Sequence, residues 1–474
     1  GGIKMLVTDG AGAGAAVTDV LDMTGGTSNV GLGSGSLGTA ITTGTENTAI
    51  GADSLDAVTT GAYNVAVGKD ALTDQTTGNY NVAVGRRAGY DITTGSENIA
   101  IGYLSLYAAT TASNNVAIGT SALQANTSGT DNVAVGDRAG TAITTGTDNT
   151  FIGDNAGTAT TTANHNTALG SGALDTNTTG ANNVAVGSRS LQANTTASNN
   201  TAVGYDSLYA NTTGHSNVAV GRDALALNTT ANYNTGVGYI SLAANSTGTE
   251  NAGFGRASLN ANTTGSYNTG LGTNSLANNT TADNNTGIGS NALAANTTGA
   301  DNVAVGSATL DANTTGAENT AVGRAALGAN TTASYNTGVG FTALEANTTG
   351  ASNTALGTAA LAANTTPNNN TAVGRSALAA NTTGAANTAV GALALDANTT
   401  AENNTAVGKN SLTTNTTGAN NTAIGVDGMK FNTTGQYNVS VGALALKANT
   451  TASYNVAVGY GTLEANTTGA VNTA

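Results

Sequence analysis

The sequence has few of the side chains with which proteins carry out chemistry. Its 474 residues contain no cysteine, no tryptophan, one proline and two histidines, and only 8% of them are charged. So few titratable groups leave little material for a catalytic site. The absence of cysteine fits an oxidising exterior. We therefore expect a protein that is not an enzyme and that needs no cofactor.

Positive charge is also scarce. The 13 Lys and Arg residues stand against 27 Asp and Glu, for a net charge of -14, which disfavours non-specific binding to nucleic acid or anionic lipid. No run of about 18 apolar residues could span a membrane. Yet 39% of the residues are hydrophobic, whereas disordered segments combine low hydrophobicity with high charge. We expect an ordered protein with no nucleic-acid partner and no membrane insertion within this segment.

What the sequence has in abundance is a single repeat. An asparagine recurs every 17 residues from Asn47 to Asn472, and an imperfect earlier copy begins at Asn29. We number the repeat from position 0 at this asparagine to position 16. Position 4 is glycine in every complete copy, position 3 is always apolar, position 2 is nearly always Ala or Gly, and position 8 is leucine in 21 of 25 copies. A fixed period of this kind is typical of a solenoid.

The first five positions alternate in the way that predicts a β-strand. Positions 1 and 3 fall on one face, and positions 0, 2 and 4 fall on the other. Positions 8 and 10 form a second short alternating run, so we expect two strands and two turns in each coil. We expect positions 1, 3, 8 and 10 to fill the interior. Position 4 never carries a side chain, which indicates a positive φ or a close backbone approach.

Some copies lack the leucine at position 8. Where that position is Gly89 or Gly140, position 11 becomes Ile92 or Ile143 instead of the usual asparagine. This substitution indicates that a lost aliphatic side chain is replaced nearby, as a shared core would require.

A 17-residue unit is too small to fold alone, but stacked copies share a core and satisfy each other's backbone groups. The sequence predicts an all-β parallel β-solenoid of about 26 coils over residues 29–474, preceded by a cap or connector over 1–28. We expect the repeat to continue beyond residue 474. Position 2, on the face opposite position 3, is small and uncharged, which favours close approach of another copy of the chain. We therefore expect an oligomer.

The pentads NVAVG, NVAIG and NTAIG resemble the head repeats of trimeric autotransporter adhesins, which are YadA-like. Longer units such as GTSALQANTSGTDNVAV also resemble the repeats of tail-fibre-type proteins of bacteriophages and aquatic bacteria. The resemblance covers residues 29–474 and implies a homotrimer of left-handed parallel β-rolls that serves as a shaft or head for adhesion. The unit is longer than the usual autotransporter head unit, so phage fibre, bacterial adhesin and structural filament all stay open.

Candidate sites for chemistry are few. The run GLGSGSLG at 31–38 lacks the strand, loop and helix context of phosphate-binding loops, so we interpret it as turn glycines. His165 and His215 lie in separate copies without a paired carboxylate pattern, and we interpret them as loop residues. The glycine-aspartate nonapeptide of calcium β-rolls is absent. We expect no metal site.

The strongest surface signal is a ladder of asparagines at position 11, each followed by Thr or Ser and then Thr. In a structural interpretation these side chains cap backbone groups at a corner. In a functional one each is an N-glycosylation acceptor. In a third, the threonines at positions 12 and 13 form a flat hydroxyl array that binds ice or crystalline polysaccharide. The ladder consists of Asn177, Asn194, Asn211, Asn228, Asn245, Asn262, Asn279, Asn296, Asn313, Asn330, Asn347, Asn364, Asn381, Asn398, Asn415, Asn432, Asn449 and Asn466.

Together these features predict a non-enzymatic fibre located outside the cell, at the cell surface or on a virion tail. It would mediate adhesion or receptor binding, or act as a rigid spacer. Its partners would be copies of itself and the glycans or proteins of a host-cell surface, bound by many weak identical contacts. The alternative is a structural extracellular filament or sheath, N-glycosylated along the asparagine ladder, with no specific receptor.

Overall fold

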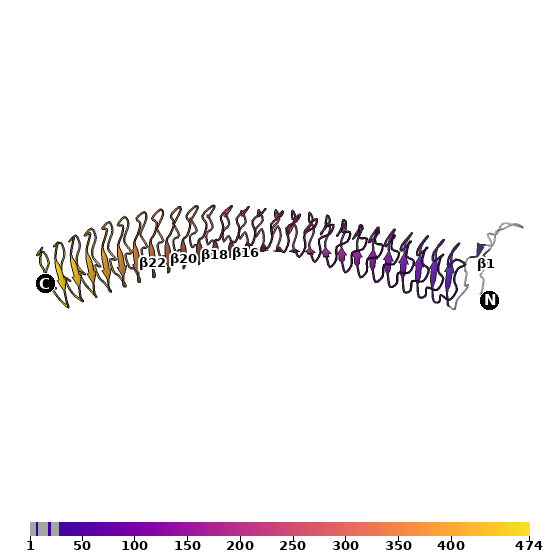
Figure 1. Cartoon of the computed structure of the whole chain (residues 1–474), viewed down its shortest axis with the longest axis horizontal. Helices are drawn as coiled ribbons and strands as arrows, with labels where there is room; N and C mark the ends of the chain where they lie inside the picture. Colours follow the sequence, from indigo (N-terminus) through magenta and orange to yellow (C-terminus); the bar gives the residue numbers. More distant parts are fainter. Residues whose placement is uncertain (1–5, 8–17, 20–27) are drawn as a thin grey trace. The chain divides into compact units, whose positions relative to one another are not determined.

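The computed structural model describes residues 6–7, 18–19 and 28–474. The chain divides into two compact units, Gly1–Tyr233 and Asn234–Ala474. Each unit is a stack of coils, and the described residues form strands and turns but no helix (Figure 1). The cap or connector expected over 1–28 lies almost wholly outside the described residues. Within it, β1 (Leu6–Val7) pairs antiparallel with β2 (Thr18–Asp19).

In the first unit each coil contributes one three-residue strand, at positions 1 to 3 of the repeat. These strands are β3 (Val30–Leu32), β4 (Thr48–Ile50), β5 (Val65–Val67), β6 (Val82–Val84), β7 (Ile99–Ile101), β8 (Val116–Ile118), β9 (Val133–Val135), β10 (Thr150–Ile152), β11 (Thr167–Leu169), β12 (Val184–Val186), β13 (Thr201–Val203) and β14 (Val218–Val220).

The second unit repeats this arrangement. Its strands are β15 (Thr235–Val237), β16 (Ala252–Phe254), β17 (Thr269–Leu271), β18 (Thr286–Ile288), β19 (Val303–Val305), β20 (Thr320–Val322), β21 (Thr337–Val339), β22 (Thr354–Leu356), β23 (Thr371–Val373), β24 (Thr388–Val390), β25 (Thr405–Val407), β26 (Thr422–Ile424), β27 (Val439–Val441) and β28 (Val456–Val458).

From β3 onward, successive strands within each unit pair parallel. β3 pairs with β4 at an offset of 18 residues, and from β4 onward each strand residue lies beside the residue 17 places later. Thr150 pairs with Thr167 in the first unit, and Val303 pairs with Thr320 in the second. The predicted parallel β-solenoid with 17 residues per coil is therefore confirmed. The second strand predicted around positions 8 to 10 is wrong, because those positions lie in turns.

Backbone hydrogen bonds between coils continue beyond the strands. The amide of Leu174 donates to the carbonyl of Ser190 at 3.0 Å, and the amide of Thr178 donates to the carbonyl of Thr195 at 2.8 Å. Each turn therefore satisfies its polar backbone groups on the coil beside it, which a buried backbone requires. Because of these hydrogen bonds, the turns of neighbouring coils stack as regularly as the strands of the sheet.

Fewer positions of the repeat point into the interior of each coil than the sequence suggested. Ala66 at position 2 and Leu72 at position 8 are fully buried, whereas Ile50 and Val84 at position 3 are 39% and 36% exposed. The burial expected for Leu at position 8 is confirmed. The interior placement expected for positions 1, 3 and 10, and the outward placement of position 2, are wrong.

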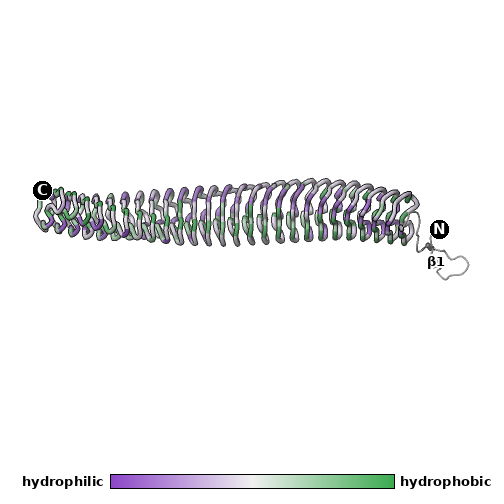
Figure 2. Tube along the Cα trace, turned by 90° about the horizontal axis from the view of Figure 1, so that it is seen from below, coloured by the Kyte–Doolittle hydropathy of each residue, from purple (hydrophilic) through white to green (hydrophobic). Residues whose placement is uncertain are grey.

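The reason is space. Two asparagines, at positions 0 and 11, and one leucine already occupy the inside of a typical coil, such as Asn183, Asn194 and Leu191. The strand can therefore turn only its smallest side chain inward, and strand alternation then places positions 1 and 3 outside. Hydrophobic and hydrophilic segments consequently recur in coil after coil (Figure 2).

Coils without the leucine fill its space from elsewhere. A Cβ on Gly157 would lie 2.7 Å from ring atoms of Phe151, and a Cβ on Gly89 would lie 2.9 Å from the Cδ1 of Ile92. Phe151 and Ile92 are both fully buried. The predicted replacement of the lost aliphatic group is thus confirmed, and Phe151 adds a case in which the filling side chain comes from the strand itself.

Position 4 shows both of the features expected for its glycine. Gly187 has φ of 131°, and a Cβ on it would lie 2.5 Å from the carbonyl oxygen of Gly204 in the next coil. The strand therefore ends where the backbones of two neighbouring coils are in direct contact. Any side chain at this position would push the coils apart.

Candidate functional site

The outward face of the sheet is uncharged, with an apolar side chain at position 3 and most often threonine at position 1. We call the side chains at positions 1 and 3 the strand face, and none of them is charged in any copy. Leu169 in the first unit is 46% exposed, and Leu356 in the second is 47% exposed. Because a partly exposed apolar side chain recurs at position 3 in each coil, the strand face of each unit carries an apolar row of the kind that marks an interaction surface.

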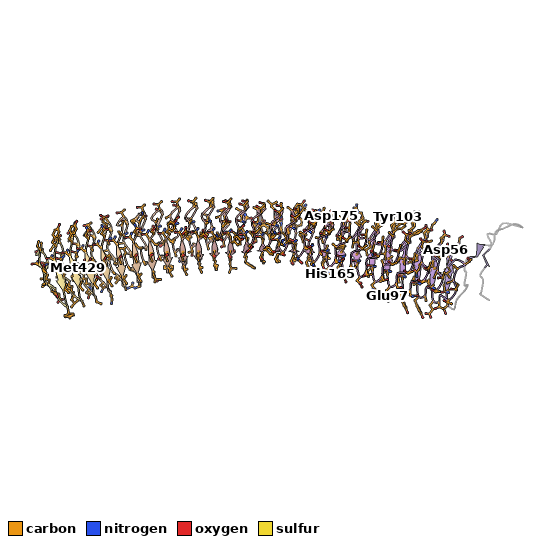
Figure 3. The ribbon with its side chains drawn as sticks, viewed as in Figure 1. Asp56, Glu97, Tyr103, His165, Asp175 and Met429 are labelled. Carbon is orange, nitrogen blue, oxygen red and sulfur yellow. The ribbon has the colours of Figure 1, made fainter. Side chains whose placement is uncertain are left out.

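Two rows of longer side chains border the strand face. Position 16 comes just before the asparagine at which the strand begins, and position 5 follows the glycine at which it ends. From Lys69 onward every lysine and arginine lies at position 5, 6 or 9, whereas positions 15 and 16 carry acidic, aromatic and small residues and both histidines. In the first unit, Glu97 and His165 at position 16 lie on one edge and Tyr103 at position 5 lies on the opposite edge (Figure 3).

The basic edge is ordered by contacts between neighbouring coils. The Arg189 guanidinium lies 2.6 Å from a carboxylate oxygen of Asp206 and 4.8 Å from the ring centroid of Tyr205. Arg222 also lies over the Tyr205 ring, 5.6 Å from its centroid. Cation–π contacts and exposed ion pairs are individually weak, so they orient these side chains more than they stabilise the coil.

The acidic edge contains stacked aromatic rings. Tyr63 and Tyr80 stack with ring centroids 4.9 Å apart, and Tyr437 and Tyr454 stack at 5.1 Å. These tyrosines are 42% to 59% exposed. Such exposed rings offer flat apolar surfaces to whatever lies beside the strand face.

The two histidines lie on this edge and do not come together. Nε2 of His165 is 3.7 Å from a carboxylate oxygen of Asp148, and His215 contacts the Tyr233 ring edge-on at 5.0 Å. Across residues 28–474 no three His, Asp or Glu side chains gather as metal ligands. The run at 31–38 turns through glycines with positive φ, among them Gly35. Its first two residues belong to β3 and the rest form a turn, as interpreted from the sequence.

The position-11 asparagines lie inside the coil. The Asn194 Nδ2 donates to Asn177 Oδ1 at 2.9 Å and to the Ala197 carbonyl at 3.0 Å. Every ladder asparagine from Asn177 to Asn449 is fully buried, and Asn466 is half-buried in the last coil. A surface ladder of glycosylation acceptors is therefore wrong for the folded chain, because the acceptor nitrogen is buried and donating. The geometry is that of the structural interpretation.

A second asparagine ladder, at position 0, was not recognised from the sequence. The backbone amide of Asn183 donates to Asn166 Oδ1 at 3.0 Å, and Asn166 Nδ2 donates to the Gly180 carbonyl at 2.9 Å. Asn177 Nδ2 donates to the same carbonyl at 3.0 Å. Where position 11 is asparagine, both ladders thus converge on one backbone oxygen, as they do at Gly180. The signal that could have revealed this role is that no complete copy lacks the asparagine at position 0.

The threonine rows differ from each other. The Thr178 hydroxyl donates to the Thr195 carbonyl at 3.0 Å, and this bond recurs along position 12. Thr179 at position 13 is exposed. Because the hydroxyl protons of position 12 are used between coils, the double hydroxyl array considered from the sequence is not formed, and in the coils over residues 28–474 the exposed row of hydroxyl groups is the one at position 13.

Comparison with known proteins gives no family for this chain. No protein-family model matches its sequence, and no curated protein matches it. In the part of the chain that the structure describes, no helix is long and apolar enough to cross a membrane. The resemblance to autotransporter heads and to tail fibres therefore stays a prediction that rests on the pentads.

Proposed function

We propose that the chain is a segment of a non-enzymatic extracellular fibre that forms a homotrimer through its strand face. The fibre mediates adhesion, or it holds a binding tip away from a surface. The observation that carries this proposal is the exposed, uncharged strand face on coils whose interior is already filled. An aliphatic stripe that contributes little to the core of its own coil fits burial against another chain.

The energetics favour assembly because the contact is repeated. Burial of apolar surface contributes about 25 cal/mol per Å². One half-exposed aliphatic side chain in a coil is a small contribution, but the entropy of bringing chains together is lost only once for the whole stack. A long series of such coils therefore associates strongly even though no single coil would.

Adhesion would follow from the same repetition. Position 13 presents an exposed threonine or serine in coil after coil, on a side of the coil that the strand face does not include. Weak contacts of these hydroxyl groups with surface glycans or proteins would act together on three chains, which raises the apparent affinity without a deep pocket.

Light scattering on the purified full chain tests the assembly. We expect the mass of three chains, and a stable soluble monomer at micromolar concentration would contradict the proposal. For adhesion, immobilised glycans and host cells would be probed with the wild-type chain and with a monomeric strand-face variant. Retention that weakens at least tenfold in the variant supports multivalent binding. Equal retention of both would contradict it.

A further inference from the structure

Two pairs of tyrosines at position 16 are stacked on neighbouring coils of the same chain. The rings of Tyr63 and Tyr80 are parallel to within 2°, with centroids 4.9 Å apart. The rings of Tyr437 and Tyr454 are parallel to within 8°, with centroids 5.1 Å apart. All four side chains are between 42% and 59% exposed. Each pair is therefore open to solvent although its two rings lie face to face.

The backbone holds the two rings of each pair on adjacent coils. The amide of Tyr80 donates to the carbonyl of Ala62 at 3.1 Å, and the amide of Tyr454 donates to the carbonyl of Gln436 at 3.0 Å. In both cases the accepting residue directly precedes the partner tyrosine in the sequence. The main chain that carries the second ring is thus hydrogen-bonded to the coil that carries the first.

Tyrosine is not the residue that this backbone favours. Position 16 has a positive φ, 61° at Tyr63 and 57° at Tyr80, which asparagine and aspartate adopt more readily than an aromatic residue. Asparagine or aspartate occupies this position in ten of the complete copies. Two consecutive tyrosines, found twice at such a position, therefore point to a role for the ring pair itself.

We infer that the pairs Tyr63–Tyr80 and Tyr437–Tyr454 are sites of oxidative coupling, at which a carbon–carbon bond between the rings joins neighbouring coils as a dityrosine. The oxidant is hydrogen peroxide acting through a peroxidase. This inference goes beyond the proposed function and does not depend on it, because both rings of each pair belong to one chain.

The coupling consumes one peroxide for each link. Each tyrosine gives up one electron and its hydroxyl proton and becomes a phenoxyl radical. The two radicals join through ring carbons next to the oxygen-bearing carbons, and the hydrogens on the joined carbons then move to the oxygens, which become hydroxyl groups again. The pair loses two hydrogen atoms in total, and these reduce hydrogen peroxide to two molecules of water.

Stacking favours coupling within a pair. Its second ring already lies about one coil spacing of 4.8 Å from the first, so the radicals need not meet by diffusion. A third stacked pair, Tyr90 and Tyr107, is only partly exposed. Tyr233, Tyr267 and Tyr335 are exposed at position 16, but neither neighbouring coil carries a tyrosine at that position. Over residues 28–474, the two inferred sites are thus the stacked tyrosine pairs with both rings well exposed.

A covalent link would join coils that no disulfide can join, because the chain contains no cysteine. A dityrosine closes a loop of backbone between neighbouring coils and, like a disulfide, lowers the entropy of the unfolded chain. Each coil of a solenoid is held only by its neighbours. The link would therefore keep together two coils that could otherwise separate at that point.

Peptide mapping tests the coupling. The purified full chain is oxidised with hydrogen peroxide and a peroxidase, denatured and digested with trypsin. Lys69 lies between the tyrosines of the first pair and Lys447 between those of the second. Trypsin therefore separates the partners unless a dityrosine joins their peptides. We expect joined peptides from both pairs, with dityrosine fluorescence, in the gel band of a single chain.

Matched variants separate pairing from exposure. Tyr63→Phe with Tyr437→Phe leaves one tyrosine in each pair, and we expect the yield of joined peptides at both sites to fall at least about tenfold. Tyr233→Phe with Tyr335→Phe removes the same number of exposed tyrosines without touching a pair, and should leave that yield unchanged. After oxidation, hydrogen exchange should be slower around the linked coils of the wild-type chain than in the first variant.

The same digestion of the chain from its natural source tests whether the bonds form there. Joined peptides from both pairs would support the inference. Three results would overturn it: coupling at Tyr233 or Tyr267 as often as within the pairs, joined peptides only in bands of several chains, or a natural chain that yields only separate peptides. A monomeric wild-type chain would contradict the proposed assembly but would still form these links.

Discussion

Asn194 donates one side-chain amide proton to the Oδ1 of Asn177 and the other to the carbonyl of Ala197, at 2.9 and 3.0 Å. An asparagine both donates and accepts, so each member of the ladder can serve the coil before it and the coil after it. Because the ladder is buried, every amide depends on its two neighbours. The ladder is a row of hydrogen-bonded amides inside coils whose apolar interior consists of one leucine and a few alanines.

Replacing a ladder asparagine should therefore be costly. Asn330 donates to Asn313 Oδ1 and to the Ala333 carbonyl, and accepts from Asn347. Asn330→Asp leaves acceptors facing acceptors and buries a charge, and we expect a loss of roughly 3–5 kcal/mol. Hydrogen exchange should show the damage in nearby coils only, because solenoid stability depends on nearest neighbours. Thr332→Ala, at exposed position 13, should change little, and equal effects of the two would contradict the buried ladder.

The sequence could predict the period, the parallel stacking, the leucine core and the glycine at position 4, because each depends on a strict spacing. It could not predict which way the strand faces. A pentad such as NVAVG alternates equally well with Val65 or Ala66 inward, and general hydrophobicity favours the valine. The outcome depends on the room left by Leu72 and the asparagines, which is a property of the closed coil. The positive φ of Leu72, 51°, likewise has no sequence signal, because leucine rarely adopts it.

In the coil that begins at Asn149, Phe151 stands where most coils have alanine and Gly157 stands where most have leucine. We expect these two replacements to compensate each other. Phe151→Ala should destabilise by about 3–5 kcal/mol by leaving a cavity. Gly157→Leu alone should cost roughly 1–3 kcal/mol, because its Cβ would meet the Phe151 ring. Together the changes restore the usual alanine and leucine, and Gly157 already has the φ of 61° that matches Leu174 at 55°.

A double-mutant cycle on thermal or denaturant unfolding measures this coupling. We expect the double variant to be more stable than either single variant, with a coupling energy of at least about 2 kcal/mol. Additive losses would show that Phe151 does not occupy the space of the missing leucine.

Adding a methyl group at the end of a strand tests the close backbone contact. Gly357 has φ of 137°, and a Cβ there would lie 2.6 Å from the Gly374 oxygen. We expect Gly357→Ala to destabilise by roughly 2–4 kcal/mol through clash and backbone strain. Gly328→Ala is the matched control, since its Cβ would have only ordinary contacts, the nearest at 3.4 Å. Similar melting temperatures for the two variants would contradict this contact.

Two aspartates should respond to pH in opposite directions. Burial raises the pKa of Asp311 above its usual value, although backbone hydrogen bonds from its own amide and that of Ala312 oppose the shift. The folded chain then holds a proton that the unfolded chain has lost, so this group's contribution to stability falls as pH rises through the raised pKa. Asp311→Asn should therefore raise the melting temperature at pH 7, and the gain should disappear below about pH 4.

The pKa of Asp427 is shifted in the opposite direction, below its usual value. Partial burial would raise its pKa, but hydrogen bonds from Asn410 and Lys430 and the charges of Lys430 and Lys447 lower it. Its stabilising effect is present above the unfolded pKa and is lost as pH falls through the folded one. Asp427→Asn should therefore lower the melting temperature at pH 7 and have little effect in acid. Shifts of the same sign for both variants would contradict the two environments.

Two adjacent residues test which side of the strand meets another chain. Ala355 at position 2 is fully buried, and Leu356 at position 3 is 47% exposed. Ala355→Lys places a charged side chain in a filled interior, and we expect a local loss of several kcal/mol with increased hydrogen exchange in the surrounding coils. Leu356→Lys has room at its own position, so the coil should keep its melting temperature under conditions where the chain is monomeric.

For assembly we expect the opposite ranking, with Leu356→Lys weakening the oligomer more directly than Ala355→Lys. Leu356→Lys puts a charge in the middle of the proposed interface, and light scattering should show the oligomer dissociating at a concentration at least tenfold higher than for wild type. Glu345→Lys, one coil away and off the strand face, introduces the same side chain as a control and should leave the mass unchanged. If Leu356→Lys stayed fully assembled while Ala355→Lys dissociated with its coils intact, the original expectation that position 2 faces the partner would return and the strand face would lose its role. The burial of Ala355 makes that outcome unfavourable, because its side chain can reach a neighbour only by opening its own coil.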